Sequence, residues 1–526
     1  MKLNDFSNSL KYRLLDQYMV GPYTITISLI TNGAQFSNIL YDFFPIIESN
    51  PSLRGIFYLT TQHLKSESHS ISSFSFNRIL AEKIKSAKNF LKKISLNQSY
   101  ETIQKIAELS AFKSMNLEKI FPFLLDDNIE EFFLDSPGSS IYLDHRKWGR
   151  CLTKVHLSEQ ELESFITLVR ADSGYRLDIT NPSLKTELIT KYFHVRVSLD
   201  ISPLVVDKLH LDVRKIRKKV FTLPELIVNG TISPEICAYI YFCLLRKRNI
   251  TVTGEPGAGK TTLLNALDIL TPPNWRKITI EDVVESVSQL EYGKHQVRFR
   301  VEPYEEGEKR YSKSSEIIKL LHRSPDYIYL GEIQTKEHSM AMFHALSAGL
   351  TGLQTCHSAS PEHLLLRWIF HHQIPMALLQ TLDIIIHIKK VRINGKYVRR
   401  VIRVCELETP KNIKLYPSVQ EIRLIDIFKW DPTTDSHKQC LNDLYNTPTI
   451  QKIRKYEDIS RKHFFNELES LRTIFKELVQ RRIFDIKMVV KVFHYLHAKY
   501  FESNKKRMDP SEILSKILET TLQFKY

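Results

Sequence analysis

The chain has 526 residues and a mass of 61.6 kDa, and 43% of its residues are hydrophobic and 25% charged. This composition is ordinary for a globular protein, and it argues against a disordered chain, a collagen-like fibre and a disulfide scaffold. The length predicts roughly two to four domains. Basic residues exceed acidic residues by 74 − 59 = 15, which permits a partner with anionic phosphates or lipid headgroups without requiring one.

The cysteines are scattered, and no two of them form a C-x-x-C pair, so a zinc ribbon is not expected. We expect reduced, buried thiols in a cytoplasmic protein. The longest apolar run, Ile236 to Leu245, is shorter than the roughly 18 residues that a membrane span needs. The N-terminus shows no signal-peptide pattern. The six cysteines are Cys151, Cys237, Cys243, Cys356, Cys405 and Cys440.

The first hundred residues carry few signals. Tyr23 to Ile30 is β-branched and predicts a strand, and the Ser-rich stretch Ser66 to Phe76 indicates a linker or loop. Ala81 to Leu96 mixes lysines with apolar residues at helical spacing and predicts a basic amphipathic helix. That helix either presents a solvated lysine face or contacts a membrane or a partner.

A mixed α/β pattern follows over Phe121 to Lys219. Ile129 to Leu134 and Ser140 to Leu143 are predicted strands. Ser158 is a predicted N-cap, because Glu161 stands three residues later and completes a capping box.

The middle third alternates short apolar runs with helical patterns, which predicts a parallel sheet with helices on its faces. A hairpin is expected around Asn394-Gly395. After Pro410 the chain is basic, and we expect it to be helical, with a stripe of apolar residues from Phe464 to Leu478. The short runs are Ile250 to Thr253, Ile278 to Ile280, Tyr327 to Leu330, Leu353 to Thr355 and Ile384 to Ile388.

The strongest motif is the stretch Gly254 to Thr261, which reads GEPGAGKT and lies between a predicted strand and a predicted helix. It matches G-x-x-x-x-G-K-[ST], whose glycines let backbone N–H groups converge on phosphate oxygens. Lys260 would reach the β- and γ-phosphates, and the Thr261 hydroxyl would ligate Mg²⁺. The expected nucleotide-binding residues are Gly254, Glu255, Pro256, Gly257, Ala258, Gly259, Lys260, Thr261 and Thr262.

Acidic residues and one histidine stand at the ends of further predicted strands. Glu281, with Asp282 and Glu285 beyond it, follows one strand, and Glu332 follows the strand that starts at Tyr327. In parallel sheets, ligands bind beyond the carboxyl ends of the strands. The two glutamates are therefore candidate metal ligands and catalytic groups. His357 ends another strand and is a candidate sensor of the γ-phosphate.

These four elements, in this order, resemble the type II/type IV secretion ATPase family, whose members are RecA-like hexameric motors. The resemblance extends to an entry segment that starts at Leu223 and a basic linker that starts at Arg214. It also covers a family-like N-terminal domain around Tyr142 and His194. The four matching boxes are GEPGAGKTTLLNAL (254–267), TIEDVVE (279–285), PDYIYLGEI (325–333) and GLTGLQTCHS (349–358).

The resemblance implies an α/β fold. A RecA-like P-loop motor domain would follow a mixed α/β N-terminal domain, with helical extensions at both ends. We expect an N-terminal extension over 1–110, the α/β domain and linker over 111–220, the ATPase domain over 221–408 and a helical region over 409–526. The segment Phe428 to Asp435 is similar to archaeal members rather than bacterial ones.

Three positions depart from the family pattern. Gln334-Thr335 stands where the family has Arg-Gly, and Leu350 stands at the first histidine of its His box. The Arg-rich stretch before the second acidic strand is reduced to His322-Arg323. Lys260, Thr261, Glu281, Glu332 and His357 are retained, so hydrolysis is still expected.

In such motors an arginine from a neighbouring domain stabilises the charge that develops on the γ-phosphoryl group. Arg196 is the leading candidate because it falls in a matched segment. Arg214 or Arg217 of the linker are alternatives, and Arg298 and Arg300 are weaker ones.

The resemblance therefore predicts a Mg²⁺-dependent, hexameric ATPase that powers an archaeal type IV pilus-like filament or secretion through a polytopic membrane platform protein. Such a motor would be cytoplasmic and peripheral to the inner face of the cell membrane. Two alternatives remain open. One is a DNA-translocating ATPase of the same fold, and the other is an assembly scaffold that binds nucleotide and barely hydrolyses it. The sequence favours nucleic acid less, because it shows no basic stripe with interleaved aromatic residues.

Overall fold

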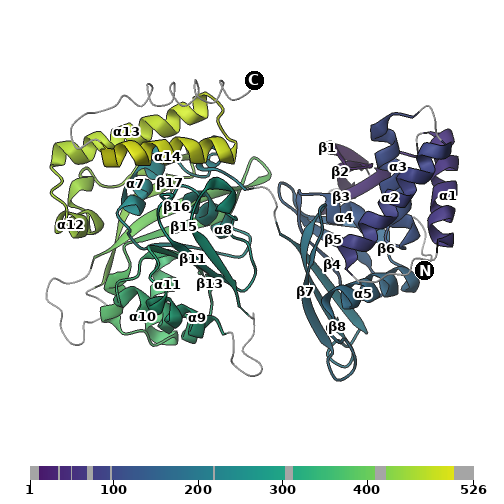
Figure 1. Ribbon diagram of the computed structural model, residues 1–526, viewed down its shortest axis with the longest axis horizontal. Coiled ribbons are helices and arrows are strands. Elements are labelled where there is room, and N and C mark those ends of the chain that lie inside the picture. The colour runs from purple at the N-terminus through teal and green to yellow at the C-terminus, as the bar shows by residue number, and fades with distance from the viewer. Residues whose placement is uncertain are drawn as a thin grey trace, which may run out of the picture. The chain divides into compact units, whose positions relative to one another are not determined.

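The structure is a computed structural model (Figure 1), and it describes residues 11–32, 36–48, 50–67, 75–94, 98–216, 220–301, 312–408 and 422–502. The chain divides into two compact units. Unit 1 contains residues 1–218 and 393–397, and unit 2 contains residues 219–392 and 398–526. The finer division into four domains stays a prediction.

Unit 1 is built on one mixed sheet. In the part of the chain that the structure describes, the sheet has nine strands in the order β1-β2-β3-β6-β5-β4-β9-β8-β7. The N-terminal hairpin strands thus join the same sheet as the later strands, where β3 runs parallel to β6. The strands are β1 (Lys11–Val20), β2 (Tyr23–Asn32), β3 (Phe36–Pro45), β4 (Ile129–Leu134), β5 (Ser140–His145), β6 (Gly149–His156), β7 (Ser183–Ile189), β8 (His194–Ile201) and β9 (Leu209–Lys215).

Helices pack on this sheet around a single core. The predicted basic helix is confirmed, and its apolar residues, such as Leu80 and Ile84, are buried while Lys85 is exposed. The exposed lysine face fits both a solvated surface and contact with a membrane or a partner, so both interpretations stay predictions. Ser158 caps its helix with the predicted capping box to Glu161. The helices are α1 (Pro51–Ser66), α2 (Phe76–Ile94), α3 (Tyr100–Ser114), α4 (Phe121–Leu125) and α5 (Glu159–Ser173).

Unit 2 contains the second sheet, in the order β12-β11-β13-β14-β10-β15-β16-β17-β18 over its described residues. The strands from β12 to β15 run parallel, as the short apolar runs predicted. The strands are β10 (Ile250–Gly254), β11 (Lys277–Glu281), β12 (Gln296–Arg300), β13 (Tyr327–Ile333), β14 (Gly352–His357), β15 (Ile384–Ile393), β16 (Lys396–Glu408), β17 (Arg423–Asp431) and β18 (Ser436–Gln439).

Helices cover both faces of this sheet (Figure 1). Along β13 the side chains alternate, because Tyr327 and Tyr329 enter one core while Ile328 and Leu330 enter the other. One face carries α7, α8 and α13, and the other carries α9, α10 and α11. The helices are α6 (Leu223–Val228), α7 (Pro234–Leu245), α8 (Lys260–Asp268), α9 (Lys313–Lys319), α10 (Lys336–Ser347), α11 (Pro361–Leu366), α12 (Pro448–Arg454), α13 (Arg461–Gln480) and α14 (Ile486–Glu502).

The apolar run from Ile236 to Leu245 lies within α7, whose side chains are almost all buried in the core of unit 2. None of the described helices is both long enough and apolar enough to cross a membrane. The apolar stripe of α13 is likewise buried, at Phe464, Leu471, Phe475 and Leu478.

Two expectations for the region after Pro410 are wrong. The described part is not helical throughout, because β17 and β18 extend the sheet before the helices begin. Antiparallel pairing of β17 with β16 satisfies backbone groups that a helix would otherwise satisfy internally. The six cysteines are free, and five of them are buried, but Cys440 is exposed because it directly follows β18, the edge strand of the sheet.

Candidate nucleotide-binding site

The glycine-rich loop leaves the carboxyl end of β10 and enters α8. Gly257 and Gly259 have φ values of +71° and +98°, which glycine adopts without strain. Gly254 is required by space, because a Cβ atom there would lie 2.2 Å from the carbonyl oxygen of Ile388. Gly259 occupies the N-cap of α8 and has no side chain to accept from the first N–H groups of the helix. These donors suit an anion such as phosphate.

Lys260, the first residue of α8, folds back over this loop. Its ammonium donates to the carbonyl oxygens of Gly254 at 3.1 Å and Glu255 at 3.0 Å. It also lies 2.9 Å from Nδ1 of His357. Only 7% of Lys260 is exposed, so these acceptors replace water around its charge.

His357 joins the loop to the second acidic strand. Gly254 and His357 are register partners at the ends of the parallel strands β10 and β14. On its other side, Nε2 of His357 contacts a carboxylate oxygen of Glu332, near the end of β13. The structure therefore brings three of the predicted residues, Lys260, His357 and Glu332, into one continuous chain of contacts.

Glu281, the last residue of β11, lies against the same strand end, because its side chain packs beside the bare Cα of Gly331. Its carboxylate accepts from the Glu285 N–H at 3.2 Å, the Ser286 N–H at 2.9 Å and the Ser286 hydroxyl at 2.5 Å. Burial raises the pKa of Glu281 to about 7, although the hydrogen bonds from Ser286 oppose this rise.

Sequence reasoning missed three residues around the site. The buried ammonium of Lys313, at the start of α9, donates to Asp282 and, at 2.6 Å, to the carbonyl oxygen of Glu332. The Arg399 guanidinium on β16 donates to the Gly257 carbonyl oxygen at 3.3 Å, and burial lowers its pKa to about 10. Ser286 is the third. Lys313 and Arg399 carry no signal in the sequence because their partners lie far along the chain, and Ser286, five residues after Glu281, looks like any serine of a polar loop.

The remaining predicted residues are placed as follows. Thr261 and Thr262 lie in the first turn of α8 and are half-buried. Arg298 on β12 donates to the Ser286 carbonyl oxygen at 3.3 Å, so it supports the loop that holds Glu281. Arg300 is the register partner of Glu281.

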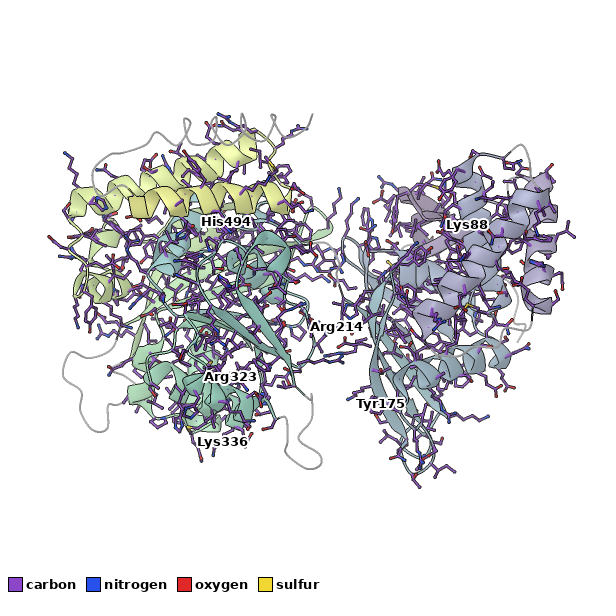
Figure 2. The ribbon with its side chains drawn as sticks, in the orientation of Figure 1. Lys88, Tyr175, Arg214, Arg323, Lys336 and His494 are labelled. Atoms are coloured by element: carbon purple, nitrogen blue, oxygen red, sulfur yellow. The ribbon has the colours of Figure 1, made fainter. Side chains whose placement is uncertain are left out.

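The arginine candidates of unit 1 lie on its sheet. Arg196 on β8 and Arg214 on β9 are register partners (Figure 2 labels Arg214). Arg214 is also the register partner of Glu131. Burial raises the pKa of the Glu131 carboxyl, and the positive charge of Arg214 opposes this rise in part. Arg217 lies outside the described residues. The role of each of these arginines stays a prediction.

The departures from the family pattern have structural explanations in part. The Thr335 side chain caps α10 by accepting from the His338 N–H at 3.2 Å. Leu350 packs against a hydrophobic core. Arg323 (labelled in Figure 2) donates to Glu316 at 2.7 Å and lies 4.1 Å from the ring centre of Phe299. Gln334 is exposed, and nothing in the structure explains it.

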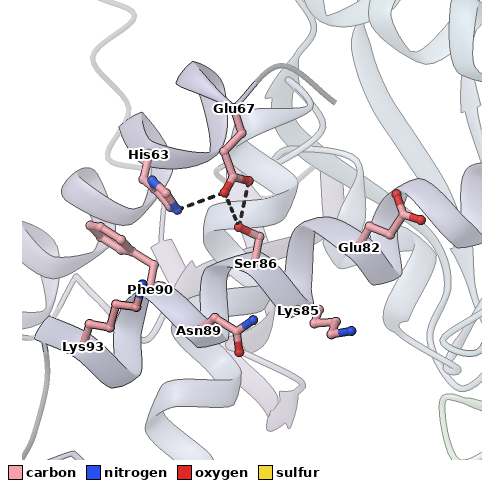
Figure 3. A pocket seen from close by; sticks show the side chains of 8 residues that line it. All are labelled: His63, Glu67, Glu82, Lys85, Ser86, Asn89, Phe90 and Lys93. Atoms are coloured by element: carbon pink, nitrogen blue, oxygen red, sulfur yellow. Dashed lines mark hydrogen bonds and ion pairs between the residues drawn. The ribbon is translucent and has the colours of Figure 1, made fainter. Parts of the chain in front are cut away.

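An open pocket of about 380 Å³ lies elsewhere, between α1 and α2 of unit 1 (Figure 3). Part of its lining is paired internally, because Ser86 donates to Glu67 at 2.7 Å and His63 stacks on Phe90 with ring centres 4.2 Å apart. Lys85 and Lys93 balance Glu67 and Glu82 along its lining. The pocket contains none of the predicted site residues.

The oxygen donors of the site suit Mg²⁺ bound together with phosphate. Across the described ranges, no three His, Cys, Asp or Glu side chains gather as a metal cage. Mg²⁺ in phosphate sites is usually bound by one or two protein oxygens together with the substrate phosphates. The Thr261 hydroxyl and the Glu332 carboxylate are suitable oxygen donors of this kind, so the residues present fit the ion.

Unit 2 has parallel strands from β12 to β15 between two helical layers, with a glycine-rich loop leading from β10 into α8, which is the α/β arrangement expected of a RecA-like domain. The comparisons with known proteins agree. A model of the family described as "Type II/IV secretion system protein" matches residues 180–425. An uncharacterized protein of Methanocaldococcus jannaschii, MJ1287, is 30% identical over 275 residues, which are 52% of this chain and 96% of that protein. The chain belongs to the type II/IV secretion system protein family.

Other similar proteins have assigned roles. The type IV secretion system protein PtlH of Bordetella pertussis is 25% identical over 274 residues, covering 48% of this chain and 79% of that protein. Among solved structures, the Legionella pneumophila ATPase DotB is 15% identical, with 77% of this chain and 95% of that chain covered and a TM-score of 0.41.

Proposed function

We propose that this protein is a Mg²⁺-dependent ATPase that converts ATP hydrolysis into movement of a membrane-associated assembly. The observation that carries the proposal is the chain of contacts from Lys260 through His357 to Glu332, set at the carboxyl ends of parallel strands beside the glycine-rich loop. Similarity to a protein that is named as a type IV secretion system protein supports a role in such an assembly.

Each residue of the site has a proposed task. The loop and the first turn of α8 bind the phosphates with backbone N–H groups, and Lys260 exchanges its carbonyl acceptors for the β- and γ-phosphate oxygens. Thr261 and Glu332 would hold Mg²⁺, with Glu281 as a further oxygen donor. The ion, when bound, neutralises charge that develops on the phosphoryl oxygens. Glu332 and Glu281 orient water. His357 loses its contact with Lys260 when that lysine moves to the phosphates, and it passes the change on to Glu332.

The movement that ATP hydrolysis would drive is proposed from the resemblance to the secretion ATPase family. A ring of six subunits would act on a polytopic membrane platform protein and extrude the subunits of an archaeal type IV pilus-like filament, or drive secretion. Similarity to a Methanocaldococcus jannaschii protein supports the archaeal assignment. In this ring Arg196 would reach the phosphates from a neighbouring subunit. The protein would then be cytoplasmic and peripheral to the inner face of the cell membrane.

Phosphate release by the purified full chain with Mg²⁺-ATP, together with the mass of the assembly, tests the proposal. We expect turnover in a ring and its loss in Lys260→Ala, whereas Lys476→Ala is the matched control, because this lysine is 43% exposed on α13. Turnover in Lys260→Ala equal to that of the wild-type protein would exclude the proposed site.

The same assay separates the alternatives. Strong stimulation by DNA, with a steep loss of binding at higher salt, would favour a DNA translocase. Tight binding of ATP without phosphate release in the assembled ring would favour a nucleotide-binding scaffold.

A further inference from the structure

The two acidic strand ends are not held together by the sheet itself. Register pairing between β11 and β13 runs from Lys277 to Ile280 and stops at Leu330. Past this point, the pairing of β13 with β14 shifts register between Leu330 and Glu332. Such a bulge redirects the chain and leaves part of the ladder unpaired. Glu332 remains paired with Thr355 of β14, but the pairing of β11 with β13 does not extend to Asp282 and Glu332.

Lys313 supplies a connection at this point. Its ammonium contacts the Asp282 carboxylate and donates to the Glu332 carbonyl oxygen at 2.6 Å. The Lys313 side chain is 1% exposed and that of Asp282 is 15% exposed. Separating the partners of a buried ion pair leaves each charge uncompensated, which costs free energy. The pair therefore holds Lys313 and Asp282 in a fixed relative position.

The location of Lys313 in its helix is unfavourable apart from these contacts. It is the first residue of α9, where the positive end of the helix dipole disfavours a cation. The helix is fixed around it, because Ser312 caps α9 and Ile317 is buried in a core. The Lys313 ammonium is thus presented from a capped helix that packs into a core.

The Glu332 carbonyl that Lys313 holds belongs to the same residue whose carboxylate contacts His357. A displaced backbone at Glu332 would move that carboxylate away from His357 and from the glycine-rich loop. Lys313 is therefore placed to fix the direction of Glu332 through the backbone of that residue.

We propose that Lys313 is a positioning residue that clamps the two acidic strand ends, and that this clamp sets the geometry of hydrolysis. The inference rests on the proposed ATPase function and adds a residue to the same site. Lys313 acts through Asp282 and Glu332, so its loss affects the rate of turnover more than the affinity for nucleotide.

Steady-state phosphate release and binding of a fluorescent ATP analogue test the clamp in the full chain. In Lys313→Met we expect affinity within about threefold of the wild-type value and kcat lower by roughly tenfold or more, because small misplacements of catalytic groups are costly. Lys313→Arg should recover part of kcat. The matched control is Lys319→Met in the same helix, where the lysine is 48% exposed and both values should stay unchanged.

The second arm removes the other half of the pair. Asp282→Asn should lower kcat similarly, and the double variant Lys313→Met/Asp282→Asn should be no slower than the worse single variant, since both changes break one interaction. A kcat within twofold of wild type in either single variant would overturn the clamp, and so would losses that multiply in the double variant. Asp282→Asn also serves if Lys313→Met does not fold.

Hydrogen exchange separates the failure of this proposal from the failure of the ATPase function. Peptides that cover residues 277–286 and 327–335 should lose protection together in Lys313→Met and keep it in Lys319→Met. If the wild-type chain releases no phosphate, the ATPase proposal fails while this result still decides the clamp. Unchanged protection of either segment would refute the clamp whatever the activity.

Discussion

The ammonium of Lys260 lies 2.9 Å from Nδ1 of His357, and this contact determines which ring nitrogen carries the proton. An ammonium only donates, so Nδ1 accepts and the proton of a neutral imidazole is on Nε2, which faces Glu332. The histidine thus links Lys260 to a carboxylate on another strand. In the proposed cycle, phosphate oxygens attract Lys260 away from Nδ1, and the contact of the ring with Glu332 then changes.

The first prediction concerns His357. His357→Ala removes this link but leaves the glycine-rich loop intact, so we expect nucleotide affinity to stay near the wild-type value. Turnover should fall by roughly 10²-fold, as for a lost orienting group. His363→Ala is the control, because this histidine is exposed on the next helix. A His357→Ala variant with full turnover would show that Glu332 is oriented without the histidine.

The second prediction concerns the close approach of the acidic strand ends. A Cβ atom at residue 331 would lie 3.1 Å from Cγ of Glu281 and 3.3 Å from the Ile280 carbonyl oxygen. Gly331→Ala should therefore displace Glu281, reduce phosphate release and cost about 1–2 kcal/mol of stability. Gly55→Ala in α1 meets nothing within 4 Å and should be neutral or slightly stabilising. Thermal denaturation and turnover of both variants, measured side by side, check this. Equal behaviour would contradict it.

The strands and the glycine-rich loop were predictable from sequence because their signals are local. A run such as Ile250 to Thr253, buried on both faces, needs β-branched residues at consecutive positions, and Gly254 must lack a side chain. The strand ends that carry Glu281, Glu332 and His357 follow from the same rule, since parallel strands end at one edge.

Other features depend on partners that sequence patterns do not reveal. The sequence around Lys313 predicts a solvated lysine. In the structure, its ammonium donates to Asp282 and Glu332, which are 31 and 19 residues away. The strand from Arg423 to Asp431 forms because it pairs with the edge of β16. The alternation of polar and apolar residues within this segment does not reveal that pairing. A trans-acting arginine requires a second subunit, so one chain leaves the choice among the candidates open.

The third prediction tests how α13 is attached to the domain core. Arg246, at the end of α7, is buried over the ring of Phe242 and donates to Glu467 at 3.0 Å with two nitrogens and to Glu457 at 2.9 Å. Arg246→Met leaves the Glu467 carboxylate, whose side chain is 12% exposed, without its partner, whereas Glu457 is 44% exposed and is solvated. We therefore expect a loss of about 3 kcal/mol, at the lower end of the range for a buried pair. Arg472→Met, at a side chain that is 36% exposed, should cost at most about 1 kcal/mol. Chemical denaturation measures both, and a small loss in Arg246→Met would mean that water reaches this network.

A buried glutamate outside the glycine-rich loop should make the stability of unit 2 depend on pH. The Glu406 carboxylate on β16 accepts from the Tyr239 hydroxyl and from the Thr449 N–H at 2.8 Å. Burial raises the pKa of Glu406 from 4.5 to about 7, and the negative charge of Asp383 adds to this rise while the hydrogen bonds oppose it. The Tyr239 hydroxyl also lies 2.9 Å from Thr447 Oγ1, so it has a second acceptor when Glu406 is protonated.

The fourth prediction follows from the sign of this change. Because the folded-state pKa lies above the unfolded value, Glu406 supports folding while it is protonated, and this contribution is lost as the pH rises through about 7. Glu406→Gln mimics the protonated side chain and does not ionise. Between about pH 5 and about pH 8, its unfolding free energy should therefore improve relative to wild type by on the order of 2 kcal/mol. Denaturation across this range, with Glu469→Gln at a side chain 57% exposed as the control, measures the gap. A constant gap would mean that Glu406 is already ionised, with water or a cation beside it.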